Sequence, residues 1–436
     1  MSTQAAIREQ WIPRLSVWLL RLAEFGLVQA AVQGLAALAG ILIVRNLSKH
    51  QYALFAIANS MQTACNLLAD LGIGVGVRSI GGRVWNDRYR FGQLLNTAFG
   101  LRKRFAIVSF SFCLPIAAWM LWRNGASTPV AFGLCAVVAA SVVPLLASSV
   151  WGISPSLHGE YRRIQKLDLG NATLRIALIA SLSLIWINAF LAALVAVVSN
   201  WVQAIFLRRW ARDHADNTAP PSQEDRRQLM RLSTKLLPNT LFFCFQGQVT
   251  LFILTLIGNS TGVADITALG RLAMILGIFA VTFGNVIGPR FGRCQDTHRL
   301  PRLYVFLVVG SVVIMTPLLL FAWLFPGSLL WLLGSQYESL RAECVWVVAA
   351  GCIGQVGGVM WNLNSSKAWI RVQSPAFIPA ILIAQIIAAL YLNLRVFHDV
   401  LIFNLVTVAA PIPVYVADAV LGMRQRLKAD SKTVNV

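Results

Sequence analysis

The chain has little charge and few acids for its length. Among 436 residues, charged residues make up 12% and hydrophobic residues 57%, and only 17 residues are Asp or Glu. A soluble domain carries about 25% charged residues, so this chain has roughly half the charge that a water-facing surface needs. Long apolar runs recur from end to end. The composition therefore predicts an all-α, polytopic membrane protein.

Several catalytic and metal-binding signatures are also missing. The seven cysteines form no C-x-x-C pair and no cluster with histidine, which argues against a structural zinc site or a disulfide framework. No G-x-x-x-x-G-K-[ST] motif occurs, so the sequence offers no ATP-binding loop. We predict no catalytic residue, no bound metal and no cofactor. The energy must then come from an ion gradient, the membrane potential or the cargo gradient, and coupling to H⁺ or Na⁺ is one option.

The apolar runs predict twelve spans in two halves. The start of the chain is basic and aromatic, lacks the pattern of a cleavable signal, and resembles an interfacial helix that leads into the first span. We predict an N-terminal six-helix bundle at 1–207, a cytoplasmic linker at 208–235, a C-terminal six-helix bundle at 236–421 and a tail at 422–436. The predicted spans are 20–44, 52–77, 104–122, 130–153, 167–187, 188–207, 236–257, 263–289, 303–325, 344–365, 374–394 and 398–421.

Lys and Arg are distributed unequally between alternate loops. With both termini in the cytoplasm, 30 of the 37 Lys and Arg residues fall in inside segments, and only five fall in outside segments. This bias predicts a cytoplasmic N-terminus and C-terminus and an even number of spans. It also accounts for the net charge of +20, so we do not expect nucleic-acid binding.

The two halves align without gaps when the chain is shifted by 212 residues. Gly76 and Arg78 then fall on Gly288 and Arg290, and the spans of one half fall on those of the other. Six spans per half give both repeats the same orientation in the membrane. Parallel repeats predict two pseudo-symmetric bundles around a central cavity and a rocking, alternating-access transporter.

Polar side chains recur at helical spacing inside the spans. Each of them is compatible with an interhelical hydrogen bond, which is the usual role of amides in membrane helices. Taken together over both halves, they favour a water-filled cavity. The predicted polar lining is Asn59, Asn66, Asn239, Gln246, Gln355 and Asn362.

Charged residues inside spans are costly and are stronger indications of function. Arg271 and Arg175 lie well inside predicted spans, whereas Arg78 and Arg290 lie at inside flanks, where they act either as membrane anchors or as groups at the cavity mouth. We predict that these four arginines bind substrate in a cationic cavity. Arginine pairs bidentately with phosphate, so this cavity suits an anionic, lipid-linked phosphate or pyrophosphate.

Two acids lie near the cytoplasmic ends of the first two spans. Asp70 and Glu24 are candidates for ion coupling, and an ion pair with Arg21 or Arg78 is an equally good interpretation of either one. Asp70 belongs to the stretch ADLGIGVGVR. Its Gly72 and Gly76 predict a close approach of a neighbouring helix rather than a phosphate-binding loop.

Three segments carry a resemblance to a known family. Residues 44–78 contain Leu47, Tyr52 and Phe55 at L-x-x-x-x-Y-x-x-F spacing and end in D-L-G; residues 257–279 place Arg271 at a basic position; residues 325–348 contain an L-x-G-x-x-Y run. This order resembles the O-antigen-type polysaccharide flippases of the multidrug/oligosaccharidyl-lipid/polysaccharide exporter superfamily. The family's usual aromatic residue is replaced by Asp265 or Ile266.

The resemblance implies a flippase that moves undecaprenyl-pyrophosphate-linked oligosaccharide across the bacterial inner membrane for surface polysaccharide synthesis. It implies the lipid-linked glycan, membrane lipids and a polysaccharide polymerase or export machinery as partners. One alternative is a cation-coupled multidrug or small-molecule antiporter of the same superfamily. Another is a membrane-embedded glycan polymerase or glycosyltransferase, which the absence of a long outside loop with paired acids disfavours.

Overall fold

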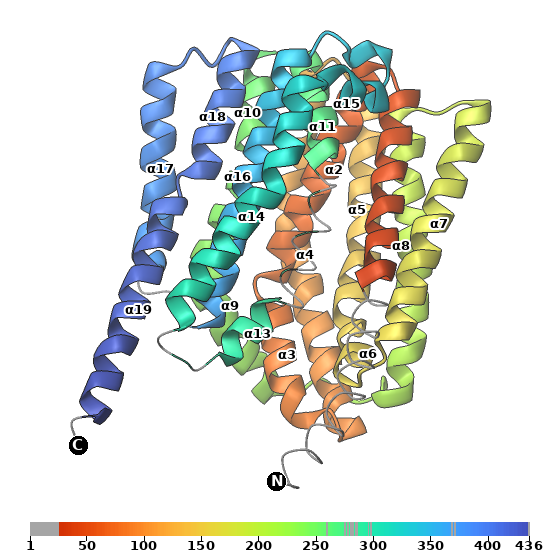
Figure 1. Ribbon diagram of the computed structural model, residues 1–436. Coiled ribbons are helices and arrows are strands. Elements are labelled where there is room, and N and C mark those ends of the chain that lie inside the picture. The colour runs from red at the N-terminus through yellow and green to blue at the C-terminus, as the bar shows by residue number, and fades with distance from the viewer. Residues whose placement is uncertain are drawn as a thin grey trace, which may run out of the picture. The chain divides into compact units, whose positions relative to one another are not determined.

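The computed structural model describes residues 26–434, apart from residues 259, 274–275, 277–278, 280–282, 284–286, 295, 297–298, 368 and 370–371. The described residues form helices and connecting turns, with no strand among them (Figure 1). This confirms the all-α prediction. The first described helix is Gly26–Asn46. The others are α2 Lys49–Asp70, α3 Ile73–Val84, α4 Arg88–Arg123, α5 Thr128–Trp151, α6 Ile153–Leu157, α7 Tyr161–Ile185, α8 Ala189–His214, α9 Gln223–Gln246, α10 Val249–Ile257, α11 Ser260–Ala273, α13 Gly288–Arg293, α14 Arg299–Leu324, α15 Pro326–Leu333, η3 Ser335–Tyr337, α16 Arg341–Ser366, α17 Gln373–Tyr391, α18 Phe397–Ala409 and α19 Ile412–Val434.

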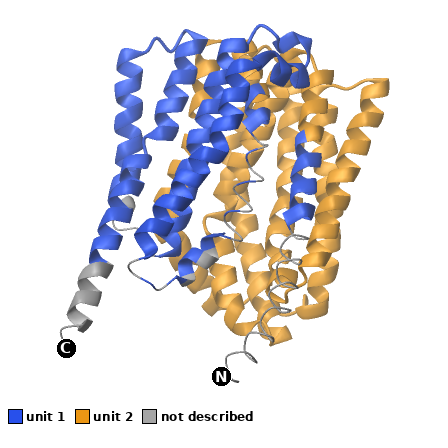
Figure 2. Ribbon diagram, in the orientation of Figure 1, with its two compact units in different colours: residues 1–37, 269–436 blue, residues 38–268 orange. Residues whose placement is uncertain are grey.

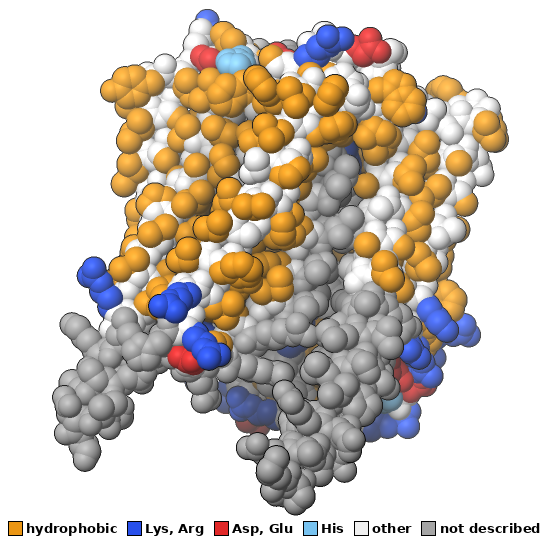
Figure 3. Space-filling model, in the orientation of Figure 1, with side chains coloured by type: hydrophobic (Ala, Val, Ile, Leu, Met, Phe, Trp, Pro, Cys, Tyr) orange, Lys and Arg blue, Asp and Glu red, His pale blue; other side chains and the backbone are white. Residues whose placement is uncertain are grey.

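Eight helices in the described part of the chain are long and apolar enough to cross a membrane. A ninth results if α9 and α10, which are bent by 42° at their junction, count as one broken span. Of the three other predicted spans, one falls on α2, one on α17, and one on α11 and the partly described segment that follows it. Hydrophobic side chains cover the middle of the visible helices, and Lys and Arg gather near helix ends (Figure 3). The chain is a multi-pass membrane protein.

The chain divides into two compact units (Figure 2). Unit 1 comprises residues 1–37 and 269–436, and unit 2 comprises residues 38–268. Unit 2 therefore contains α9 and α10 in addition to the helices from α2 to α8. The division of the chain into bundles at 1–207 and 236–421 stays a prediction.

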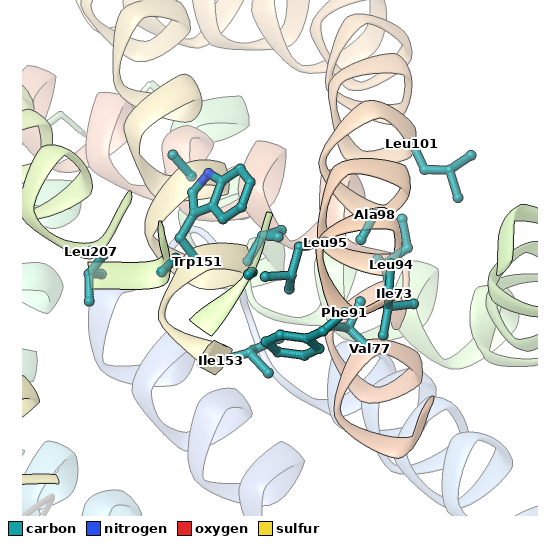
Figure 4. Close-up of a cluster of buried hydrophobic side chains, with 14 of the residues drawn as sticks. Ile73, Val77, Phe91, Leu94, Leu95, Ala98, Leu101, Trp151, Ile153 and Leu207 are labelled. Carbon is teal, nitrogen blue, oxygen red and sulfur yellow. The ribbon is translucent and has the colours of Figure 1, made fainter. Parts of the chain in front are cut away.

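In unit 2, α5 packs against α4 and α8, and α2 packs against α4. The core near α3, α4 and α6 is built from side chains at helical spacing in α4, notably Phe91, Leu94, Leu95 and Ala98, which are fully buried (Figure 4). Trp151 at the end of α5 closes this cluster. The first three turns of α4, predicted as a loop, are therefore an amphipathic extension of a membrane helix. In unit 1, α16 is central and contacts α14, α18 and α19.

The predicted second span is broken in the structure. α2 ends at Asp70, and Leu71 and Gly72 both have positive φ, at 41° and 77°, before α3 begins at Ile73. The prediction of one continuous helix over 52–77 was wrong because two left-handed residues cannot continue a right-handed helix. The close helix approach predicted at Gly72 and Gly76 is confirmed, since their α-carbons face Leu236 and Leu229 of α9.

The predicted linker 208–235 is mostly helical. α8 runs to His214 and α9 begins at Gln223, which leaves eight residues between them. These residues dock on the start of α4: Asn96 donates to the carbonyl oxygens of Asn217 and Ala219, and the Ser222 N–H donates to Thr97. Close to this contact, hydrogen bonds from the hydroxyl and the backbone N–H of Thr218 lower the pKa of Asp216.

Candidate functional site

The α7–α8 pair holds a polar network inside two membrane spans. Asp168 and Asn171 lie three residues apart on α7, so their side chains share a face. Gln203 of α8 joins them: its Nε2 donates to Asp168 Oδ1 at 2.9 Å, and its Oε1 accepts from Asn171 Nδ2 at 3.1 Å. Among the helices from α2 to α19, α8 is the main neighbour of α7, and the short α6 also contacts it.

The network leaves oxygen atoms that are not engaged by a hydrogen-bond donor. Asn171 Oδ1 is buried and finds no hydrogen-bond donor among the described residues, and it lies on the same helix face as the Asp168 carboxylate. A carboxylate and carboxamide oxygens are the donor set that hard cations prefer. A buried acceptor without a donor is costly unless another group fills it. The α7–α8 network therefore fits a small cation or a proton better than it fits an anion.

A second charged group lies where α2, α4 and α5 meet. Arg102 of α4 has a side chain that is only 3% exposed, and its Nη2 lies 2.8 Å from Asp70 Oδ1. Its Nη1 also contacts the Ser149 hydroxyl of α5. The Asp70 carboxylate in turn accepts a hydrogen bond at 2.9 Å from the Gly74 N–H at the start of α3. Asp70 thus joins both sides of the α2–α3 break to α4.

The partner of Asp70 is a correction to the sequence prediction. Asp70 pairs with Arg102, which falls between the predicted spans 52–77 and 104–122, and not with Arg78. Arg21 lies outside the described residues, and the ion-coupling role of Asp70 stays a prediction. Arg78 instead lies exposed on α3. A further acid, Asp265 of α11, pairs with Lys49 of α2 at 2.8 Å.

The predicted site residues are spread over both units. Arg175 lies half-buried on α7, one turn beyond Asn171, and Arg271 lies half-buried on α11 within unit 1. Glu24 and the Arg290 side chain fall outside the described residues. Their roles, and those of the amides, stay predictions. On α2, Asn59 and Asn66 are half-buried; on α9, Asn239 is exposed and Gln246 half-buried; on α16, Gln355 and Asn362 are half-buried.

Sequence reasoning missed Gln203 and Arg102. Gln203 is the one amide in the run WVQAIF, and the sequence carries no signal that it faces α7. Arg102 precedes Lys103 and Arg104, so it was counted with a flanking basic cluster. The apolar spacing of Phe91, Leu95 and Ala98 was the available signal that the helix begins earlier.

No protein-family model and no curated protein matches the sequence. Solved structures do match. An inward-facing multidrug resistance MATE family transporter of the MOP superfamily superposes with a TM-score of 0.68 and 18% identity, covering 93% of this chain and 96% of that one. The chain has the fold of a MOP superfamily transporter.

Other MOP superfamily structures share this fold. An outward-facing multidrug resistance MATE family transporter gives a TM-score of 0.58 at 20% identity, covering 95% of this chain and 96% of that one. A transporter from Pyrococcus furiosus gives 0.58 at 16% identity, covering 93% and 95%. That transporter is described as having a binding pocket of reversed polarity, which suggests a different function for it. These likenesses establish the fold and leave the function and the cargo open.

Proposed function

We propose that the chain is a cation-coupled secondary transporter, and that Asp168, Asn171 and Gln203 form its coupling site. The observation that carries this proposal is the buried Asn171 Oδ1, which has no donor and lies beside the carboxylate of Asp168 inside a span. Ionisable residues inside membrane spans usually mark ion pathways or proton relays. The likeness to MATE transporter folds supports the same conclusion.

Cation binding can be tested without knowledge of the cargo. We expect the purified protein to unfold at a higher temperature in NaCl than in KCl of equal ionic strength. When Na⁺ is at ten times its Kd, binding should raise the free energy of unfolding by about 1.4 kcal/mol. Asp168→Asn should abolish this difference. Asp213→Asn is the matched control, because Asp213 lies at the end of α8 with a side chain that is 56% exposed.

The outcomes separate the two candidate ions. A stabilisation by Na⁺ that Asp168→Asn removes and Asp213→Asn keeps supports Na⁺ coupling. A response to pH instead of Na⁺, again lost in Asp168→Asn, supports coupling to H⁺. An Asp168→Asn variant that responds to both ions as the wild type does would remove Asp168 from the site.

Two cargo classes remain, and each has an observation in its favour. The similar structures of multidrug resistance MATE family transporters favour a small organic compound, exported in exchange for the cation. The flippase-like motifs favour a lipid-linked saccharide, for which undecaprenyl pyrophosphate is the expected carrier. The pairing of Asp70 with Arg102 and of Asp265 with Lys49 supports the second class, because neither acid then offers an unpaired charge to a cationic drug.

A deletion strain of the source organism distinguishes the two cargoes. Loss of surface polysaccharide with unchanged resistance to cationic dyes supports the flippase, and the opposite result supports drug export. For a flippase, Arg271→Ala should abolish complementation, whereas Arg395→Ala, an exposed residue between α17 and α18, should not. Full complementation by Arg271→Ala would exclude Arg271 from substrate binding.

A further inference from the structure

The helix α9 packs against α3 and against the second half of α2. Residue numbers fall along α2–α3 as they rise along α9–α10, so the two segments are antiparallel neighbours. Each contact between the two segments involves at least one side chain, so a shift of either helix would break it. The contacting pairs are Gly76 with Leu229, Gly72 with Leu236, Ala64 O with Cys244 Sγ at 3.9 Å, and Ser60 with Gln248.

Polar contacts extend this packing to one end of the segment. Asp225, in the first turn of α9, has a side chain with no exposed surface, and both of its oxygens bind the Arg90 guanidinium of α4. The docked residues just before α9 add the hydrogen bonds from Asn96. The start of α9 is therefore fixed to α4 by a buried ion pair.

Further polar contacts lie at the opposite end. Beyond the bend, Thr255 of α10 accepts a hydrogen bond at 3.2 Å from Asn124, just after α4, and both residues are buried. On α11, Asp265 pairs with Lys49 at the start of α2. Residues 223–268 are thus held by α2, α3 and α4 at both ends and in the middle.

This pattern distinguishes fixed packing from a gate. In a rocking transporter, helices that form a gate separate at one end while they stay closed at the other. Separation at either end here would leave the charge of Asp225 or Asp265 without the base that now pairs with it. A segment that stays within one rigid body keeps its contacts at both ends and in the middle, as residues 223–268 do with α2, α3 and α4.

We infer that residues 223–268 move as part of unit 2 throughout the transport cycle, so that the seventh span belongs mechanically to the N-terminal bundle. The chain passes between the units at Ala37–Leu38 and at Ala268–Leu269, both inside helices. The inference rests on the proposed transport function. The inference concerns residues 223–268 and does not extend to the residues between α8 and α9.

Disulfide staples test the inference directly. In a background whose seven native cysteines are replaced, Ser60→Cys with Gln248→Cys, and Asn124→Cys with Thr255→Cys, place staples in the middle and at one end of the segment. We expect each oxidised pair to retain at least half of the transport rate of its reduced form, measured as ion-driven dye uptake into proteoliposomes and as complementation of the deletion strain. The four single-cysteine variants are the matched controls.

The outcomes are distinguishable from failure of the proposed function. If the cysteine-free protein transports in neither assay while the wild type also fails, the transport function itself is wrong. If the reduced pairs transport and oxidation removes most of the rate until dithiothreitol restores it, the segment is a moving gate and the inference is overturned.

A distance measurement covers the case in which a staple does not form. Nitroxide labels at Lys103 of α4 and Arg231 of α9, both exposed, lie on two helices that are inferred to move as one body. Their distance distribution should be the same in NaCl, in KCl and at acidic pH. A second distance that appears in any of these conditions contradicts the inference.

Discussion

Arg102 brings a permanent charge into the interior of unit 2. Its guanidinium is almost fully buried, its Nε has no hydrogen-bond partner, and its two other nitrogens contact Asp70 and Ser149. A buried charge is tolerated when it is paired, and removal of one partner leaves the other without compensation. The pair thereby fixes the end of α2 against α4.

Arg102→Met should lower the free energy of unfolding by about 2 kcal/mol. Loss of one member of a fully buried pair costs about 3–5 kcal/mol, and the expected value is smaller because the Asp70 side chain is 30% exposed and water can solvate it. Thermal unfolding in detergent measures the change. The double variant Asp70→Asn/Arg102→Met should recover part of the loss; a double variant less stable than Arg102→Met alone would contradict the pairing.

At the scale of the element, the extension of α4 decides where the segment between α8 and α9 docks. Gly92 lies where the backbone of Asp216 approaches α4, so a Cβ at this position would overlap that backbone. Asp216 N–H also donates to the Arg88 carbonyl oxygen at 2.9 Å. The glycine is required by close approach, not by its φ angle.

Gly92→Ala should undock the residues between α8 and α9. Overpacking costs about 1–3 kcal/mol, and we expect faster cleavage at a protease recognition site inserted into residues 215–222, a stretch without Lys or Arg. Gly100→Ala is the control on the same helix, because a Cβ there meets nothing within 4 Å. It should stabilise α4 by up to about 1 kcal/mol. Equal cleavage rates in the two variants would show that the docking does not depend on Gly92.

The break between α2 and α3 gives a second element-scale prediction. Gly72→Ala introduces a side chain at φ +77° and directs its Cβ into Leu236 of α9. We expect a loss of about 2 kcal/mol from the left-handed backbone and the overlap together. The variant Gly72→Ala/Leu236→Ala relieves the overlap alone, so it should be more stable than the sum of the two single changes predicts. Simple additivity, measured by thermal unfolding, would contradict the contact.

At the scale of the whole molecule, the sequence predicts some levels of structure better than others. Spans and helix class follow from apolar runs such as 130–153, which composition alone reveals, and these predictions are confirmed by α5 and its neighbours. Which side chains pair between helices does not follow from composition. The pairing of Asp70 with Arg102 and the bridge from Asp168 to Asn171 through Gln203 depend on the rotation of two helices about their axes, which a single sequence leaves undetermined.

The charge asymmetry makes a prediction for the whole molecule that fold comparison does not supply. Of the 37 Lys and Arg residues, 30 lie in segments predicted inside, so both termini should face the cytoplasm. In a cysteine-free background, Arg395→Cys, between α17 and α18, should react with a membrane-impermeant maleimide in intact spheroplasts. Arg299→Cys, at the start of α14 and 85% exposed, should react only after permeabilisation. The reverse pattern would invert the topology and place the Arg90–Asp225 contact at the outer surface, where the positive-inside bias gives no reason for so many basic residues.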